Sequence, residues 1–155
     1  MKSLLRTVSV AIVLLGFFAA CKTEQASRWK PVEGRIMTRW AAEVRPDSVL
    51  PEPPRPQIVR RDWLNLNGLW DYAIADKEAG RPAAWDGKIL VPFAVESALS
   101  GVAKTVGAGK ELWYRREISI PRKWRSGKVL LHFGAVDWES TVWINGREAG
   151  THRGG

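Results

Sequence analysis

Large apolar side chains alternate with smaller or polar ones over residues 69–74, where Trp70, Tyr72 and Ile74 occupy every second position. A period of two places alternate side chains on one face of a strand. A short apolar run over residues 88–91, ended by a proline, predicts a second strand that is buried. The pattern therefore predicts two strands in the first half of the folded region.

Three further stretches have strand character, namely 111–120, 129–133 and 142–144. The last of them leads into Asn145-Gly146, and both residue types tolerate the positive φ angles of a tight type I′ turn. This dipeptide therefore predicts a hairpin, with the chain after Gly146 as its second strand. Arg116 falls on the more apolar face of its stretch, so we expect it to be paired, to lie at the sheet margin or to mark a bulge.

No stretch after residue 56 keeps a helical period over three turns. Several short strands separated by turn signals are typical of an antiparallel β-sandwich, so we expect an all-β fold. The sequence ends directly after the second hairpin strand. A sandwich short of strands exposes backbone edges and part of its apolar face. We therefore expect the sandwich to be truncated at its C-terminus, as a fragment or as an incomplete gene model.

An export signal is predicted at the N-terminus. Lys2 and Arg6 precede an apolar run over residues 8–20. This run is shorter than the roughly 20 residues that cross a bilayer, and it suits a secretion signal. The residues up to Cys21 resemble a bacterial lipobox, in which the cysteine is lipidated and becomes the mature N-terminus, although Phe18 stands where that motif usually has Leu. Two alternatives stay open, namely cleavage by an ordinary signal peptidase and an incidental buried Cys21.

Residues 21–56 show no persistent period and contain a cluster of prolines. Proline removes backbone donors and restricts the residue before it to extended geometry, so this stretch is predicted to be a semi-rigid tether. The alternative is an extended arm that lies across the surface of the domain. We expect a mixture, in which residues just after Cys21 are free and those near Pro56 are docked. A short helix could begin within residues 38–41.

Composition adds three constraints. The net charge is +8, and removal of Lys2 and Arg6 with the signal lowers it to +6. The remaining basic residues are scattered along the sequence, and no nucleic-acid motif accompanies them. We therefore expect no nucleic-acid partner. Nine tryptophans favour a β fold and suit a surface that binds carbohydrate. The single cysteine excludes an intramolecular disulfide, and no metal-ligand spacing or cofactor motif is present.

Four blocks in order resemble the N-terminal sugar-binding domain of glycoside hydrolase family 2. They are residues 56–70, 89–97 and 112–116, and a closing block made of 132–138, 142–146 and 152–155. This family includes β-galactosidases, β-glucuronidases and β-mannosidases. The resemblance implies that residues 57–155 form a jelly-roll, galactose-binding-like β-sandwich. It also implies that an immunoglobulin-like sandwich and a TIM barrel with two catalytic glutamates follow in the full protein.

The resemblance further implies a retaining hydrolase, in which one carboxylate attacks the anomeric carbon and another acts as acid and then as base. The family has an Asn-Glu pair at the acid/base position, and the sequence has no such dipeptide, so no residue here is assigned a catalytic role. In the family, the loop at residues 93–97 can approach substrate. Ala94 stands where β-galactosidases have a sugar-contacting Asn, which puts galactoside specificity in doubt. Glu96 and Ser97 are the substitute substrate-loop candidates.

These expectations combine into one hypothesis. Residues 1–20 are a lipoprotein signal, 21–56 a tether or arm, and 57–155 the accessory domain of a glycosidase that acts on β-glycosides without a cofactor. The chain alone is expected to be inactive. The parent protein is expected to be exported and anchored through Cys21, in the periplasm, at the outer membrane or at the cell surface. A non-enzymatic carbohydrate-binding lipoprotein and a purely structural surface protein remain the alternatives.

Overall fold

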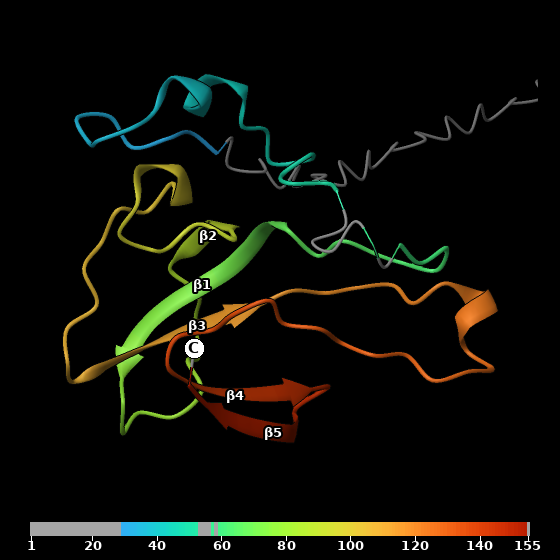
Figure 1. The fold of residues 1–155 in the computed structure, drawn as a ribbon. Coiled ribbons are helices and arrows are strands. Elements are labelled where there is room, and N and C mark those ends of the chain that lie inside the picture. The colour runs from blue at the N-terminus through green and yellow to red at the C-terminus, as the bar shows by residue number, and fades with distance from the viewer. Residues whose placement is uncertain (1–28, 53–56, 58, 155) are drawn as a thin grey trace, which may run out of the picture.

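The computed structural model describes residues 29–52, 57 and 59–154 (Figure 1). In this part of the chain, short 3-10 turns are the only helices, and strands form two antiparallel sheets. The predicted all-β class is confirmed, and the arrangement is consistent with a β-sandwich. The strands are β1 (Gly68–Asp76), β2 (Gly87–Val91), β3 (Lys110–Arg115), β4 (Glu139–Ile144) and β5 (Arg147–Arg153).

The larger sheet has the order β2-β1-β3, so the predicted strands at residues 69–74 and 88–91 lie side by side as expected. The alternating residues of β1 face the core. Tyr72 is buried with Ile89 of β2 and with Val95 of the following loop. Partly buried apolar side chains pack around these three, namely Trp70, Ile74, Val91, Val102, Val106 and Leu112. One compact cluster therefore covers a single face of this sheet.

The third strand is shorter than predicted, because β3 ends at Arg115 rather than continuing to residue 120. The next residue, Arg116, leaves the ladder, and its guanidinium donates hydrogen bonds to the carbonyls of Leu66 (3.0 Å) and Asn67 (3.1 Å). Those carbonyls belong to the chain that precedes β1, where the strand pairing stops. Of the three alternatives expected for Arg116, the structure shows a paired guanidinium at the sheet margin, and the same contact explains where the strand ends.

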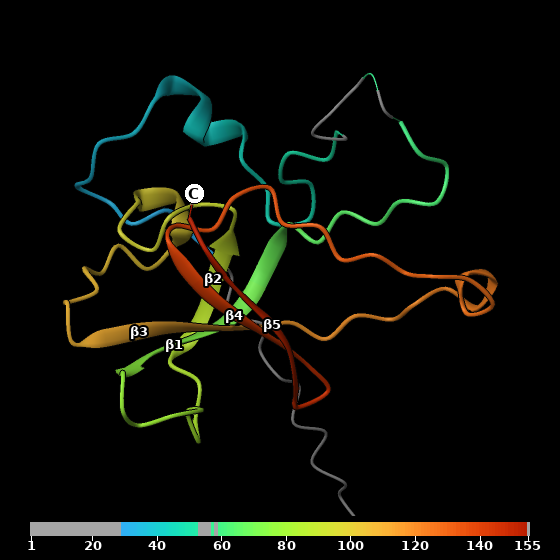
Figure 2. The same ribbon diagram turned by 60° about the horizontal axis from the view of Figure 1, so that its bottom comes forward.

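The predicted hairpin at Asn145-Gly146 is confirmed. The two residues have φ angles of 51° and 79°, and β4 pairs with β5 on either side of them. The hairpin lies below β3 in Figure 1 and crosses it in the turned view of Figure 2. Trp143 of β4 stacks on Trp113 of β3, with 5.1 Å between the ring centroids and 26° between the ring planes. This aromatic pair is a direct contact between the two sheets.

The predicted strand at residues 129–133 is wrong. These residues form no strand in the structure, and their apolar side chains are exposed. A strand requires a neighbour that accepts and donates its backbone hydrogen bonds. No strand among the described residues pairs with this stretch. Apolar composition alone therefore did not determine its structure.

The N-terminal arm lies across the domain, over β2 and the loop that follows it (Figure 1). It contains the short 3-10 helix η1 (Arg39–Glu43), which begins within residues 38–41, where a short helix was expected to begin. The Trp29 indole donates to the Leu99 carbonyl (3.1 Å), and Val49 is buried. For residues 29–52 the structure thus shows a docked arm. Residues 1–28, with the predicted signal and Cys21, and residues 53–56 lie outside the described part.

No helix in the part of the chain that the structure describes is both long enough and apolar enough to span a membrane.

Candidate functional site

The loop after β2 carries the two substrate-loop candidates, and a buried hydroxyl holds it in shape. Ser100 is fully buried at the end of the 3-10 helix η3 (Ala98–Ser100). Its Oγ accepts hydrogen bonds from the backbone N–H groups of Val102 (3.0 Å) and Ala103 (3.2 Å) and lies 3.1 Å from the Val95 carbonyl. Because a buried hydroxyl without partners is costly, these bonds favour one conformation of the loop.

Ser97 caps η3. Its hydroxyl donates to the Ala94 carbonyl (2.7 Å) and accepts from the Ser100 N–H (3.2 Å). A serine in this position satisfies a backbone donor at the start of a helix. In this structure the Ser97 hydroxyl is thus used inside the turn, and its contact with a substrate stays a prediction.

Glu96 is exposed beside Ser97 and influences Tyr114 of β3. Desolvation, with a smaller contribution from the negative charge of Glu96, raises the pKa of Tyr114 to about 12. Both effects disfavour the phenolate. The side chain of Tyr114 is still 40% exposed, so the phenol lies at the margin of the core. A role for Glu96 in contacting a substrate also stays a prediction.

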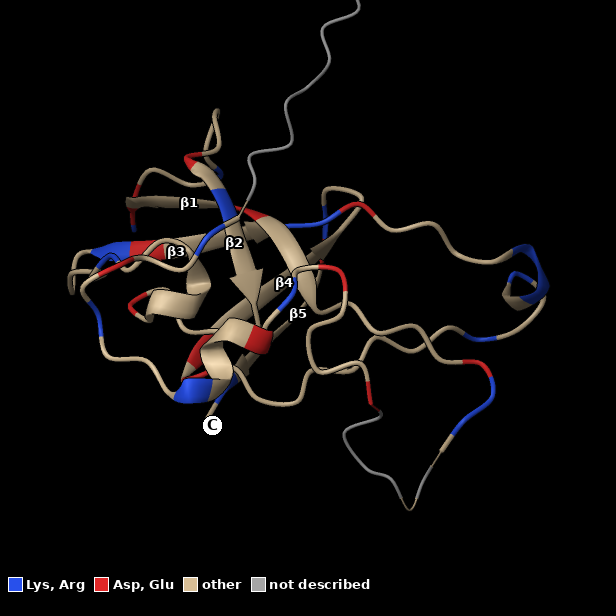
Figure 3. Ribbon diagram, turned by 90° about the horizontal axis from the view of Figure 1, so that it is seen from above, with Lys and Arg blue, Asp and Glu red and all other residues tan. Residues whose placement is uncertain are grey.

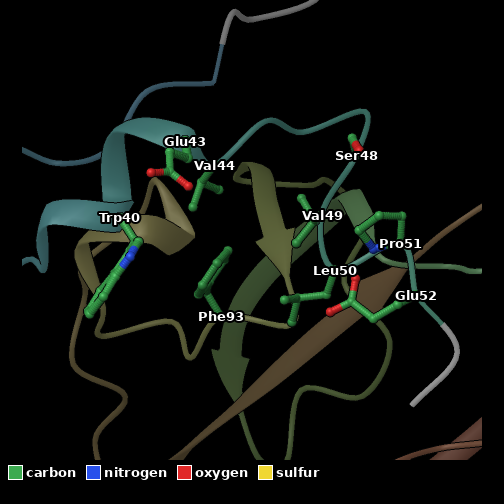
Figure 4. A pocket seen from close by; sticks show the side chains of 9 residues that line it. All are labelled: Trp40, Glu43, Val44, Ser48, Val49, Leu50, Pro51, Glu52 and Phe93. Atoms are coloured by element: carbon green, nitrogen blue, oxygen red, sulfur yellow. The ribbon is translucent and has the colours of Figure 1, made fainter. Parts of the chain in front are cut away.

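A second feature was not predicted from the sequence. Where the arm crosses the loop, a cavity of about 220 Å³ opens to solvent (Figure 4). The arm contributes most of the lining, and the loop contributes Phe93, which lies between the Trp40 indole and Leu50 in this view. Two carboxylates, those of Glu43 and Glu52, also line the cavity. The structure therefore places aromatic rings and acidic groups around one opening.

The wall of this cavity is held by the chain that leads into β1. The Asn65 side-chain amide donates to the Leu50 carbonyl (2.7 Å), and the Asn67 amide donates to the Val49 carbonyl (3.3 Å). In addition, the Asn65 carboxamide oxygen accepts from the backbone N–H of Asn67 (2.8 Å). These bonds fix the arm where it borders the opening. Both asparagines lie in the block of residues 56–70 that carries part of the family resemblance, but the resemblance did not indicate this role.

The signal for the cavity in the amino-acid sequence is indirect. Trp40 and Phe93 belong to segments far apart in the chain, and their neighbourhood depends on the docking of the arm. The hypothesis of an arm lying on the domain surface was the one feature that could have indicated it. No periodicity or spacing relates the two rings.

The strongest charge cluster lies elsewhere, in the middle of the larger sheet. Asp71 of β1 forms ion pairs with its two cross-strand partners, Lys88 (2.5 Å) and Arg115 (2.8 Å). Burial raises the pKa of Asp71, but the hydrogen bonds and charges of these two bases outweigh it, so the net effect lowers the pKa. Arg115 also lies over the Trp85 ring, 4.8 Å from its centroid. This cluster is fully paired and stabilises the sheet.

Basic and acidic residues are both scattered over the described part of the ribbon (Figure 3). Within the described ranges, no three His, Cys, Asp or Glu side chains come together in a way that could hold a metal ion. His132 lies near Trp63, with 6.0 Å between the ring centroids. The expectation that the protein does not bind nucleic acid stays a prediction.

No protein-family model matches the chain. Individual proteins do. Over 101 residues the chain is 25% identical to a β-glucuronidase of Paenibacillus borealis, and over 95 residues it is 22% identical to a β-glucuronidase of Streptococcus agalactiae serotype V. Over 99 residues it is 27% identical to a β-galactosidase of Thermoanaerobacter pseudethanolicus.

Each of these similarities covers 61% of the chain but only 17%, 16% and 13% of the respective relative. The chain thus spans about a sixth or less of the length of the curated relatives that it matches. About three fifths of its sequence is therefore similar to a small part of proteins that carry glycosidase names.

Proposed function

We propose that the chain is the N-terminal sugar-binding-type domain of a retaining family 2 glycoside hydrolase that acts on β-glycosides. One observation carries this proposal, namely the similarity of 95–101 residues to two β-glucuronidases and a β-galactosidase. The all-β fold with antiparallel sheets supports it, because the resemblance implies a jelly-roll sandwich in this position. The confirmed hairpin at Asn145-Gly146 lies within the block of sequence that carries the resemblance most specifically.

In such an enzyme the reaction requires two carboxyl groups about 5–5.5 Å apart, one as nucleophile and one as acid and base. We assign neither role to a residue of this sequence. The chain's own contribution is an anchored, rigid sandwich that supports the catalytic domain and presents the loop with Glu96 and Ser97 towards it. That loop is suited to this task because the buried Ser100 hydroxyl fixes its shape.

The proposal is tested on the native protein, captured from the cells that make it with antibodies against residues 57–155. We expect the captured protein to hydrolyse an aryl β-glycoside with retention of anomeric configuration, and the 155-residue chain to hydrolyse none. Captured protein that binds β-glycosides but cleaves none would support the binding-protein alternative instead. Turnover by the 155-residue chain would contradict the assignment of catalysis to another domain.

We also propose that the protein is exported and anchored through a lipid on Cys21, since an apolar run of signal length directly precedes this cysteine. Several acyl chains on one cysteine hold a protein durably at a membrane, whereas one chain binds weakly. In a bacterial host, the wild-type chain should incorporate labelled fatty acid and sediment with membranes. Cys21→Ser should lose both properties, while Ser27→Ala should keep them. Labelling that survives Cys21→Ser would overturn the anchor.

A further inference from the structure

The cavity between the arm and the loop has walls of two chemical kinds. Trp40 and Phe93 provide aromatic surface, and Val44, Val49 and Leu50 add aliphatic surface. Glu43, Ser48 and Glu52 provide oxygen atoms along the same lining. Binding pockets for small molecules typically combine an apolar lining with a few such polar groups. The ligand that fits this lining is itself amphiphilic.

Trp40 is the most informative member of the lining. Its side chain is 56% exposed, although large aromatics are usually buried. The Arg39 guanidinium lies 4.5 Å from the centroid of the Trp40 ring and is not among the residues that line the cavity. A cation–π contact of this kind holds an exposed indole in place. The Trp40 ring therefore borders the cavity while it remains exposed to solvent.

Two acidic residues, Glu43 and Glu52, belong to the lining of the cavity. Among the described ion pairs, none involves Glu43 or Glu52. In Figure 4 their carboxylates lie on different sides of the Phe93 ring. Ionised carboxylates accept hydrogen bonds only, so they select a ligand that donates from several sides. Among the described residues that line the cavity there is no Lys or Arg, so this part of the lining offers no cationic donor to a phosphate or to an acidic sugar.

From this lining we propose that the cavity formed by Trp40, Phe93, Glu43 and Glu52 binds one ring of an uncharged pyranoside. The C–H face of a pyranose is apolar and packs on an aromatic ring, while its equatorial hydroxyls donate hydrogen bonds to carboxylates. The volume of about 220 Å³ suits a single sugar ring rather than an oligosaccharide. This site is separate from the substrate-loop candidates Glu96 and Ser97. The proposal rests on the carbohydrate-directed role proposed above.

The test measures binding of methyl β-D-glucopyranoside, methyl β-D-galactopyranoside and methyl β-D-glucuronide to the full chain by calorimetry and by ligand-observed NMR. We expect saturable binding of at least one neutral glycoside and weaker binding of the glucuronide, because two carboxylates repel its charge. Trp40→Ala should weaken neutral-glycoside binding by about tenfold or more, the equivalent of 1.4 kcal/mol. Trp40→Phe should retain part of it, since a ring remains for stacking.

Trp138→Ala is the matched control, because Trp138 is 60% exposed and lies outside the cavity. It should leave binding unchanged, and both alanine variants should unfold at the same temperature as the wild type. The double variant E43Q/E52Q should reduce the discrimination against the glucuronide. Equal affinities of W40A and W138A, or no binding of any neutral glycoside by the wild type, would overturn the proposal. Glycosidase activity of the native protein is a separate readout, so a failure of this binding site and a failure of the proposed function are distinguishable.

Discussion

The indole of Trp29 lies directly over the backbone of Gly101, so that a Cβ atom at Gly101 would come within 2.7 Å of Trp29 Cδ1. Gly101 also has a φ of +78°, which side-chain-bearing residues rarely adopt. The first described residue of the arm is therefore fitted to a turn that lacks a side chain. This contact, with the hydrogen bond from Trp29 to the Leu99 carbonyl, fastens the arm to the domain.

Gly101→Ala should release this end of the arm and destabilise the fold. The left-handed backbone alone costs an L-residue about 1–2 kcal/mol, and displacement of the indole adds to that. Gly80→Ala is the matched control, because Gly80 has a φ of +67° but no atom within 4 Å of the position of a Cβ. Urea unfolding should show a larger loss for G101A, and limited proteolysis should cut the arm faster only in that variant. Equal losses for the two variants would mean that the Trp29 contact contributes nothing.

Arg116→Ala should lower the free energy of unfolding by about 2 kcal/mol or more, because two carbonyls lose a charged donor. Both hydrogen bonds come from one guanidinium nitrogen, Nη1, so a lysine ammonium can restore part of the contact and Arg116→Lys should be intermediate. Arg125→Ala, at an exposed arginine, should stay within about 0.5 kcal/mol of the wild type. Chemical denaturation followed by tryptophan fluorescence measures all three. An R116A variant as stable as R125A would contradict the role assigned to this contact.

Asp71→Asn should cost about 1 kcal/mol at neutral pH, since it removes the partner of two bases in the central strand. Asp76→Asn should cost less, because the Asp76 side chain is 70% exposed against 17% for Asp71. The lowered pKa of Asp71 gives the acid dependence a sign. The stabilisation is full above the ordinary carboxyl pKa of 3.8 and is lost as the pH falls through the lower, folded-state value. Thermal melts between neutral and strongly acidic pH should show the wild type and D71N converging at the acidic end.

The Trp113–Trp143 stack should contribute measurably to the joining of the two sheets. A double-mutant cycle with Trp113→Ala and Trp143→Ala should give a coupling energy of about 0.5–1.5 kcal/mol, as is usual for contacting aromatic pairs. The same cycle with Trp138→Ala in place of Trp143→Ala should be additive, because Trp138 does not stack on Trp113. Additivity of the first pair would show that the sheets are held together by other contacts.

The sequence correctly predicted several elements whose signal lies in neighbouring residues. The alternation of Trp70, Tyr72 and Ile74, the short run of β2 and the Asn145-Gly146 turn are confirmed, because period and turn chemistry are properties of neighbouring residues. For Arg116 the sequence left three alternatives open, because a guanidinium on an apolar face needs hydrogen-bond acceptors, and the structure shows it paired at the sheet margin. The signals for the two strands and for the turn can therefore be read from the local sequence without knowledge of tertiary contacts.

Tertiary structure decided the features that depend on distant partners. The apolar run at residues 129–133 forms no strand, because a ladder needs a neighbouring strand and composition does not supply one. Likewise, the cavity depends on the docking of the arm beside Phe93, to which the amides of Asn65 and Asn67 contribute, and this docking brings Trp40 to a segment far away in the chain. The sequence by itself determined an all-β chain with a defined hairpin. Only the docking of the arm, through hydrogen bonds between distant residues, decided where a ligand could be bound.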